Sequence, residues 1–257
     1  MYRDFWGSSH SQVFISSSES RRFGGITSRF NLGFDSKLTN QEIASICSKD
    51  DSDLLVLRVP SSRFELGDHL SRIESKRVLQ ADTLLYFSLD ASKFDNQFTD
   101  TPSDFELRQA VSDDYSQLQD LIKKTFDGYS NHYSANLDID SDQMLDGYLE
   151  WANLLADKEN HYVFVRKSRA EYLDGFLVIE FQDREIELVI GGTHPLARRT
   201  GSYYQLWNKA LSEMGISNVD FIRTSTQTTN VGVINSWVKS GFTYSGSVNT
   251  FHVMRKN

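Results

Sequence analysis

The chain has 257 residues, 24% of them charged, and a formal net charge of −8, values typical of a globular protein that can bury a core. An acidic chain lacks the basic face with which proteins bind DNA or RNA, so no nucleic-acid partner is expected. The single cysteine, Cys47, excludes an internal disulfide and indicates a reducing compartment.

The N-terminal segment Met1–Trp6 is polar and aromatic, and it lacks the basic and apolar regions of a signal peptide. No apolar run approaches the length of about 18 residues that a membrane span needs. We therefore expect a cytoplasmic protein with no membrane partner. The six histidines are scattered without the spacing of metal ligands, so no metal is expected.

Residues 1–91 are predicted to form a small α/β domain. The strand candidates are Gln12–Ser16, Asp53–Pro60 and Val78–Leu89, and the helix candidates are Asn40–Ser48, with Thr39 or Asn40 as N-cap, and Phe64–Ile73. The following segment, 92–104, is polar, contains Pro102 and has few apolar residues. This composition predicts a linker between two domains.

Residues 105–257 are predicted to form a second domain with the element order βααβββαβαβ. In chain order the expected elements are Phe105–Ala110, Ser112–Phe126, Ser141–Leu155, Tyr162–Arg166, Gly175–Phe181, Glu185–Ile190, Gly201–Met214, Asp220–Thr224, Val231–Lys239 and Ser247–Met254. The clearest helix is Gly201–Met214, which has an apolar face at helical spacing and is followed by Gly215, a residue type that often ends helices.

The most informative segment is His194–Tyr203, which joins a predicted strand to this helix. A glycine at position 201 would expose backbone N–H groups at the helix N-terminus, where the helix dipole favours a phosphate or pyrophosphate. Arg198 and Arg199 add positive charge at the same place. The alternative is an ordinary strand–helix connection that carries two solvated arginines.

Two motifs resemble those of the GNAT acyltransferases. Arg198 and Gly201, with Pro195 before them, match the pyrophosphate motif of that family, while Tyr203 departs from it. Within Asn230–Phe242 the positions Asn230, Lys239, Gly241 and Phe242 match a second motif in register. Two motifs in the right order indicate the family more strongly than either motif does alone.

The resemblance implies a GNAT fold of the α/β (α+β) class: a mixed, twisted sheet flanked by helices, preceded by a smaller GNAT-like domain. It implies acetyl-CoA as the acyl donor, with the pyrophosphate held by the loop of Arg198, Arg199, Thr200, Gly201 and Ser202. Backbone groups of Gly192, Thr193 and His194 would orient the thioester, and Asn230 would hold the cofactor arm.

The catalytic candidates also follow from the resemblance. Trp237 stands where the family often has a tyrosine that protonates the leaving thiolate, although an indole N–H is no practical acid; packing in the core is the alternative. Glu187 lies eleven positions before Arg198, the spacing of a base glutamate in histone-acetylating members, and a solvated glutamate is the alternative. His194 and His252 are rival bases.

Shorter segments resemble the dTDP-fucosamine acetyltransferase group, which acts on dTDP-4-amino-4,6-dideoxygalactose. They are Phe5–Gly7, Asp53–Pro60, Leu79–Leu89, Ser130–Tyr133, Tyr148–Trp151, Ser225–Gln227 and Thr250–His252. This resemblance implies a nucleotide-linked amino sugar as acceptor, lined by Asn131, His132 and Tyr133, and leaves a homodimer open. An acyltransferase for a peptide or antibiotic amine, or a non-catalytic acyl-CoA-binding module, are the alternatives.

Overall fold

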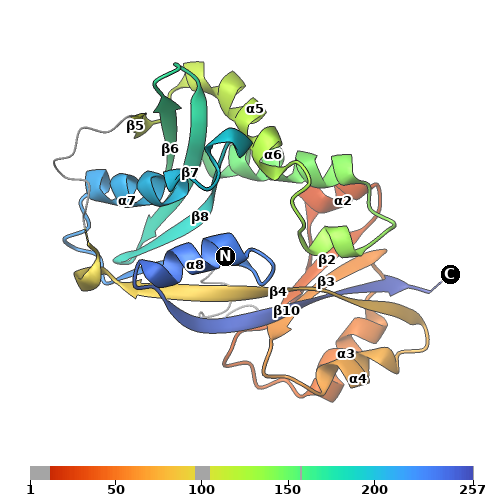
Figure 1. The fold of residues 1–257 in the computed structure, drawn as a ribbon. Coiled ribbons are helices and arrows are strands. Elements are labelled where there is room, and N and C mark those ends of the chain that lie inside the picture. Colours follow the sequence, from red (N-terminus) through yellow and green to blue (C-terminus); the bar gives the residue numbers. More distant parts are fainter. Residues whose placement is uncertain (1–11, 96–104, 157, 257) are drawn as a thin grey trace.

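The computed structural model describes residues 12–95, 105–156 and 158–256, and within them ten strands form one sheet (Figure 1). The order across the sheet is β1-β2-β3-β10-β4-β9-β8-β7-β6-β5. The strands are β1 (Val13–Ile15), β2 (Thr27–Asn31), β3 (Leu54–Pro60), β4 (Lys76–Asp90), β5 (Phe105–Gln109), β6 (His161–Ser168), β7 (Leu173–Gln182), β8 (Glu185–Thr193), β9 (Phe221–Gln227) and β10 (Thr243–Arg255).

Helices cover both faces of this sheet. The α-helices are α2 (Ser17–Phe23), α3 (Asn40–Lys49), α4 (Leu66–Ser71), α5 (Tyr115–Phe126), α6 (Ser141–Ala156), α7 (Ser202–Met214) and α8 (Val231–Lys239), and short 3-10 helices include η3 (His132–Ala135) and η4 (Pro195–Ala197). No helix in the described part of the chain is long and apolar enough to cross a membrane.

The predicted fold class is confirmed: the sheet is mixed and flanked by helices, and residues 105–257 follow the order βααβββαβαβ. Helix α2 and strand β2 had not been predicted. Residues Phe5–Gly7 and the part 96–104 of the predicted linker lie outside the described residues.

The two faces of the sheet have separate apolar cores. On one face, which we call the α7 face, α3 and α4 pack on β2, β3 and β10, while α7 and α8 pack on β4, β5, β6, β7, β8 and β9. On the opposite face, which we call the α5 face, α5 and α6 pack on β6, β7 and β8, and α2 and η3 lie over β3 and β10. Strand β3 is therefore buried on both faces, which explains its nearly continuous apolar sequence.

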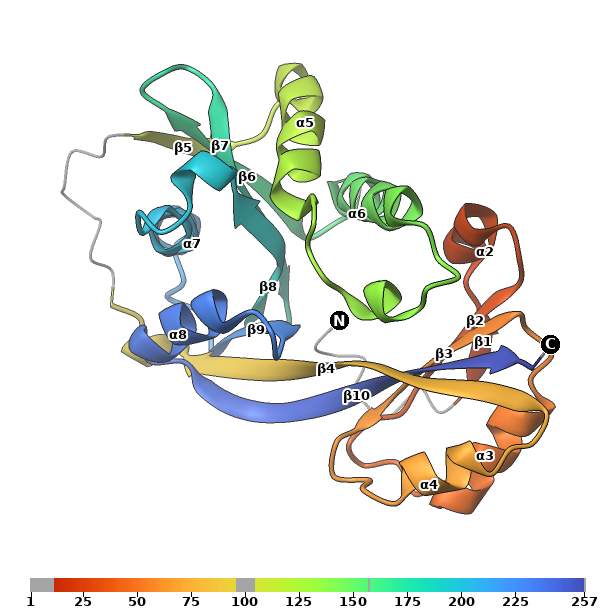
Figure 2. The same cartoon turned by 45° about the vertical axis from the view of Figure 1, so that its right-hand side comes forward.

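The chain contains two runs with the same order of elements. The run β2-α3-β3-α4-β4 has a parallel pair, β2 and β3, and the run β8-α7-β9-α8-β10 has a parallel pair, β8 and β9. The last strand of each run crosses to the other run: β4 pairs with β9, and β10 pairs with β3. Figure 2 shows β4 and β10 side by side along the middle of the molecule, where they also pair with each other.

The sheet is thus continuous between the two predicted domains, 1–91 and 105–257. The exchanged strands β4 and β10 tie the first run to the second through backbone hydrogen bonds. The division of the chain into these two domains stays a prediction.

Candidate active site

Strands β8 and β9 separate in the middle of the sheet. They pair in parallel from Glu185 with Phe221 as far as Leu188 with Thr224, although β8 continues to Thr193 and β9 to Gln227. A β-bulge at Val189 changes the register of β8 against β7 at the same level, and bulges bend a strand locally. Beyond this point the two strands leave backbone groups facing each other without pairing, which suits an extended ligand.

The end of β8 leads into the loop that carries the predicted pyrophosphate motif. The amide of His194 donates to the carbonyl oxygen of Asp174 (2.8 Å), and η4 follows directly. Arg199 and Gly201 have left-handed backbone, with φ values of 65° and 81°. Alternation of backbone handedness turns successive N–H groups toward one side of a loop, which makes a site for an anion.

The helix that follows this loop begins without a side-chain cap. Its N-cap is Gly201, which has no side chain that could accept a hydrogen bond from the first turn of α7. The first N–H groups of a helix have no partner within the helix. An external anion can therefore take the place of the missing cap.

In the first run of elements, the helix N-terminus that corresponds to that of α7 has a side-chain cap. Helix α3, which follows β2, has Thr39 as N-cap, and Glu42 accepts hydrogen bonds from the Thr39 amide and hydroxyl (both 2.8 Å). This capping box places a carboxylate at the helix N-terminus, where it would repel a phosphate. Of the two strand–loop–helix units, the one at α7 is suited to bind an anion.

Several predicted cofactor residues pack around the end of α5. The Arg198 guanidinium donates to the carbonyl oxygen of Thr125 (2.8 Å), and Thr200 and Ser202 share a hydrogen bond between their hydroxyls (2.7 Å). A Cβ on Gly192 would lie 2.4 Å from Cγ2 of Thr125, so only glycine allows this approach. Gly192, Thr193, His194 and Arg198–Ser202 thus lie on one strand end and its loop, as the sequence predicts; their roles stay predictions.

Glu187 lies on the α5 face of β8 and is 6% exposed. Its neighbours in the register are Glu180 on β7 and Arg223 on β9. Arg223 forms an ion pair with Glu185 (2.5 Å), so its positive charge lies close to the carboxylates of Glu185 and Glu187. Glu187 is therefore a buried carboxylate one residue before the point where β8 and β9 separate.

Trp237 lies on the opposite face, within the core of α7 and α8. It is 2% exposed, and its ring centroid is 5.6 Å from that of Phe87 and 6.3 Å from that of Phe242. These are the contacts of a packing residue. Tyr203 of α7 belongs to the same core.

A tyrosine that sequence reasoning missed lies closer to the strand ends. Tyr129, in the loop after α5, donates a hydrogen bond from Oη to Oε1 of Gln227, the last residue of β9. Asn230 Nδ2 donates to Thr226 Oγ1 (3.0 Å) and to Tyr129 Oη (3.4 Å). Burial raises the pKa of Tyr129, although hydrogen bonds with Thr226 and Asn230 lower it in part. The phenol is therefore protonated at neutral pH. Asn230, predicted from the second motif, therefore joins a polar group at the end of β9.

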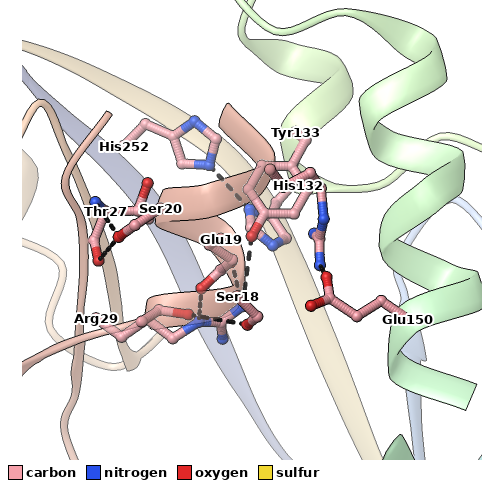
Figure 3. A network of polar contacts seen from close by, with 11 residues as sticks. Ser18, Glu19, Ser20, Thr27, Arg29, His132, Tyr133, Glu150 and His252 are labelled. Atoms are coloured by element: carbon pink, nitrogen blue, oxygen red, sulfur yellow. Dashed lines mark hydrogen bonds and ion pairs between the residues drawn. The ribbon is translucent and has the colours of Figure 1, made fainter. Parts of the chain in front are cut away.

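The three predicted acceptor residues lie together at η3, with Asn131 as its N-cap, and the contacts that the structure gives them are internal. Figure 3 shows His132 and Tyr133. Asn131 accepts from the amide of Tyr133 (2.8 Å) and donates to Oη of Tyr148 (3.2 Å). His132 Nδ1 lies 2.9 Å from His252 Nε2, and Tyr133 Oη accepts from Arg29 (3.4 Å). Their acceptor role stays a prediction.

Comparisons with known proteins identify the fold. No family model and no curated protein matches the chain. Among solved structures, a functionally unknown conserved protein from Staphylococcus epidermidis is 11% identical with a TM-score of 0.62, over 98% of this chain and 94% of that one.

Two further solved structures are named as GNAT proteins. A tandem GNAT protein from the clavulanic acid biosynthesis pathway is 12% identical with a TM-score of 0.56, over 89% of this chain and 75% of that one. A GCN5-related N-acetyltransferase from Sphaerobacter thermophilus is 10% identical with a TM-score of 0.55, over 79% and 61%. The chain therefore has the GNAT fold.

Proposed function

We propose that the protein is an acyl-CoA-dependent N-acyltransferase that uses acetyl-CoA to acetylate a primary amine of a small molecule. The observation that supports this most is the separation of β8 and β9 directly before a helix whose N-cap is Gly201. An extended ligand with a pyrophosphate would fit both features, because the strands offer backbone groups where they separate and the helix offers N-terminal amides without a side-chain cap from Gly201. The fold, shared with structures named as GNAT proteins, agrees with this proposal.

In this proposal the acyl donor runs from the loop to the strand ends. Amides of Arg199–Ser202 bind the pyrophosphate, and Arg199 contributes charge. The Arg198 amide donates to the carbonyl oxygen of Pro195 (3.2 Å), and the Arg198 guanidinium holds the loop against α5 through Thr125. Backbone groups of Gly192–His194 orient the thioester, and Asn230 holds the cofactor arm. Positioning of the amine against the thioester carbonyl would supply much of the rate acceleration.

The transfer itself forms a C–N bond and breaks a C–S bond. Only the neutral amine attacks the thioester, and Glu187, directly or through a water, takes the ammonium proton. The leaving sulfur needs a proton or a hydrogen bond, and we assign this role to Tyr129 because its hydroxyl lies with Gln227 and Asn230 at the end of β9. Trp237 is buried in the core of the other face, and an indole is a poor acid.

The acceptor that we propose is a nucleotide-linked amino sugar, as the resemblance to the dTDP-fucosamine acetyltransferase group implies. The acceptor would lie on the α5 face, where Glu187 and Tyr129 lie. Asn131, His132 and Tyr133 hold η3 over this face by the contacts given above and would shape the acceptor site. The protein would work in the cytoplasm, where acetyl-CoA is available, and the two runs of elements would form a GNAT-like first domain and a catalytic second one.

Two matched glycine variants test the donor site. Gly201 and Gly215 stand at opposite ends of α7, both have positive φ, and a Cβ at either would meet no atom within 4 Å. Replacing either by Val therefore strains the backbone, at the left-handed Gly201 by on the order of 1–2 kcal/mol. We expect Gly201→Val to abolish acetyl-CoA binding in calorimetry, with a thermal shift like that of Gly215→Val, which should keep its affinity. Equal affinities in both variants would remove the phosphate-loop assignment.

An acetylation assay separates the enzyme from a non-catalytic acyl-CoA-binding module. Candidate amines are incubated with acetyl-CoA, and free thiol and the mass of each amine are measured. Acetylation of any amine supports the enzyme. Tight binding of CoA without acetylation of a peptide, antibiotic or sugar amine would favour the module.

A further inference from the structure

Polar residues form a band across four neighbouring strands on the α5 face. Arg58 lies on β3, Thr250 on β10, Asp82 on β4 and Gln227 on β9. Thr250 is the register partner of both Arg58 and Asp82, so these three side chains stand in a row on the same face. We call Arg58, Thr250, Asp82 and Gln227 the polar band.

Several buried atoms of the polar band and of neighbouring His252 have no hydrogen-bond partner among the described residues. They are Arg58 Nε, Thr250 Oγ1, His252 Nδ1 and both carboxylate oxygens of Asp82. Arg58 is 6% exposed, and Thr250 and His252 are fully buried. A buried polar group without a hydrogen-bond partner lowers the stability of the fold by about 1–3 kcal/mol. Several such groups in one place therefore indicate a site that binds a ligand.

The other cations of this region have carboxylate partners. Arg29 makes two hydrogen bonds to Glu19 (2.5 and 2.6 Å), as Figure 3 shows, and Arg22 pairs with Glu150 (2.6 Å). No carboxylate of the described residues lies within ion-pair distance of Arg58. Arg58 is therefore the cation on this face that is placed to bind an anion from outside.

The opposite end of the polar band reaches the proposed reaction centre. Gln227 accepts the hydrogen bond of Tyr129, and Asp82 lies on the next strand. The Gln227 amide and the Thr250 hydroxyl lie near the Asp82 carboxylate without reaching hydrogen-bond geometry. Burial raises the pKa of Asp82, although the charge of Arg58 and these two polar groups lower it in part. Strands lie about 4.8 Å apart, so the backbones at Asp82 and Arg58 are about 10 Å apart.

We propose that the polar band is the acceptor site and that the acceptor is a primary amine that carries an anionic group, either a phosphate or a carboxylate. Asp82 holds the ammonium group beside the thioester, and Arg58, with Thr250 and His252, holds the anion. The proposal rests on the proposed N-acyltransferase function and specifies its acceptor. It also gives the first run of elements a direct part in recognition, because Arg58 comes from β3.

Two pairs of amines test this proposal and distinguish the two anions. Glucosamine 6-phosphate is compared with glucosamine, and 4-aminobutyrate with butylamine, by the rate of CoA thiol release. We expect kcat/KM to be higher for the anionic member of at least one pair by about tenfold or more, the value of a hydrogen bond to a charged group. The pair that shows the preference identifies phosphate or carboxylate as the anion.

Three variants locate the anion site. Arg58→Met should remove the preference within the pair, so that the anionic and the neutral amine react with similar kcat/KM, and Thr250→Val should reduce the preference by a smaller factor without loss of thermal stability. Arg72→Met is the control, because this arginine is exposed at the C-cap of α4 and pairs with Asp68; it should leave the preference unchanged.

The outcomes separate this proposal from the proposed function. A preference that survives Arg58→Met and Thr250→Val, or neutral amines preferred in both pairs, would overturn the acceptor site while acetylation still supports the enzyme. Loss of rate with neutral and anionic amines alike in Arg58→Met would also overturn it. Failure of the wild-type protein to bind acetyl-CoA would overturn the proposed function itself.

Discussion

Lowering the pH from 7.5 to 5.0 should destabilise the folded protein through a pair of buried imidazoles, His132 and His252. The two rings are in contact through Nδ1 and Nε2 (2.9 Å), and they are 5% and 0% exposed. Burial, and the positive charge of Arg58 next to it, lower the pKa of His252 from 6.5 to about 4 and the pKa of His132 well below its ordinary value. His252 is therefore mostly neutral in the folded protein at pH 5.0, whereas in the unfolded chain it is protonated, and the pKa of His132 is shifted in the same direction.

The sign and size of the effect follow from this difference. Between the folded pKa of about 4 and the unfolded value of 6.5 the unfolded chain binds more protons, so acid favours unfolding. For His252 alone, the two values give a loss of about 2 kcal/mol between pH 7.5 and pH 5.0. His132 adds to the loss with the same sign, and the contribution is complete once the pH falls below the folded pKa values.

Urea denaturation at both pH values measures the free energy of unfolding. The variant His252→Gln keeps an amide that can bond His132 and removes one titrating group. We expect the wild-type protein to lose about 2 kcal/mol more than His252→Gln between the two pH values. An equal loss in the two proteins, with unchanged m-values, would show that His252 titrates alike in both states and would refute the reasoning.

Three further predictions concern the proposed reaction. Glu187→Gln should lower turnover mainly below pH 8, where the amine is protonated; an unaltered pH–rate profile excludes Glu187 as the base. Tyr129→Phe should lower kcat by on the order of a hundredfold, with little change in acetyl-CoA affinity, as thiol-release kinetics and calorimetry would measure; full turnover removes its role as acid. Gly192→Ala should weaken acetyl-CoA binding, because its Cβ would push against Thr125; an unchanged Kd in calorimetry contradicts this.

The sequence predicted those elements that have a strong local pattern. Strand β3 was indicated by its continuous apolar run, and α7 by an apolar stripe between Gly201 and Gly215. Helix α2 was missed because its sequence, SSESRRF, has no apolar stripe. It is held by tertiary contacts such as the ion pair between Arg22 and Glu150 of α6.

The site was predictable where it is continuous in sequence. The loop of Arg198–Ser202 follows one strand and precedes one helix, so its local chemistry can be recognised from a motif. The polar band could not be found in this way, because it takes one residue each from β3, β10, β4 and β9, and only the strand register places them side by side. Tyr129 was missed for the same reason, since its partners lie at the end of β9.

The exchange of β4 and β10 has a consequence for synthesis on the ribosome. Strand β3 has β10 as its neighbour, and β10 is translated after every other element of the described chain. Until β10 has been translated, the first run of elements therefore has one edge of β3 and the apolar surface under Phe251 and Val253 uncovered. Contacts between such distant segments form slowly. We expect fragments that end before β10 to aggregate or be degraded, and neither half to mature without the other.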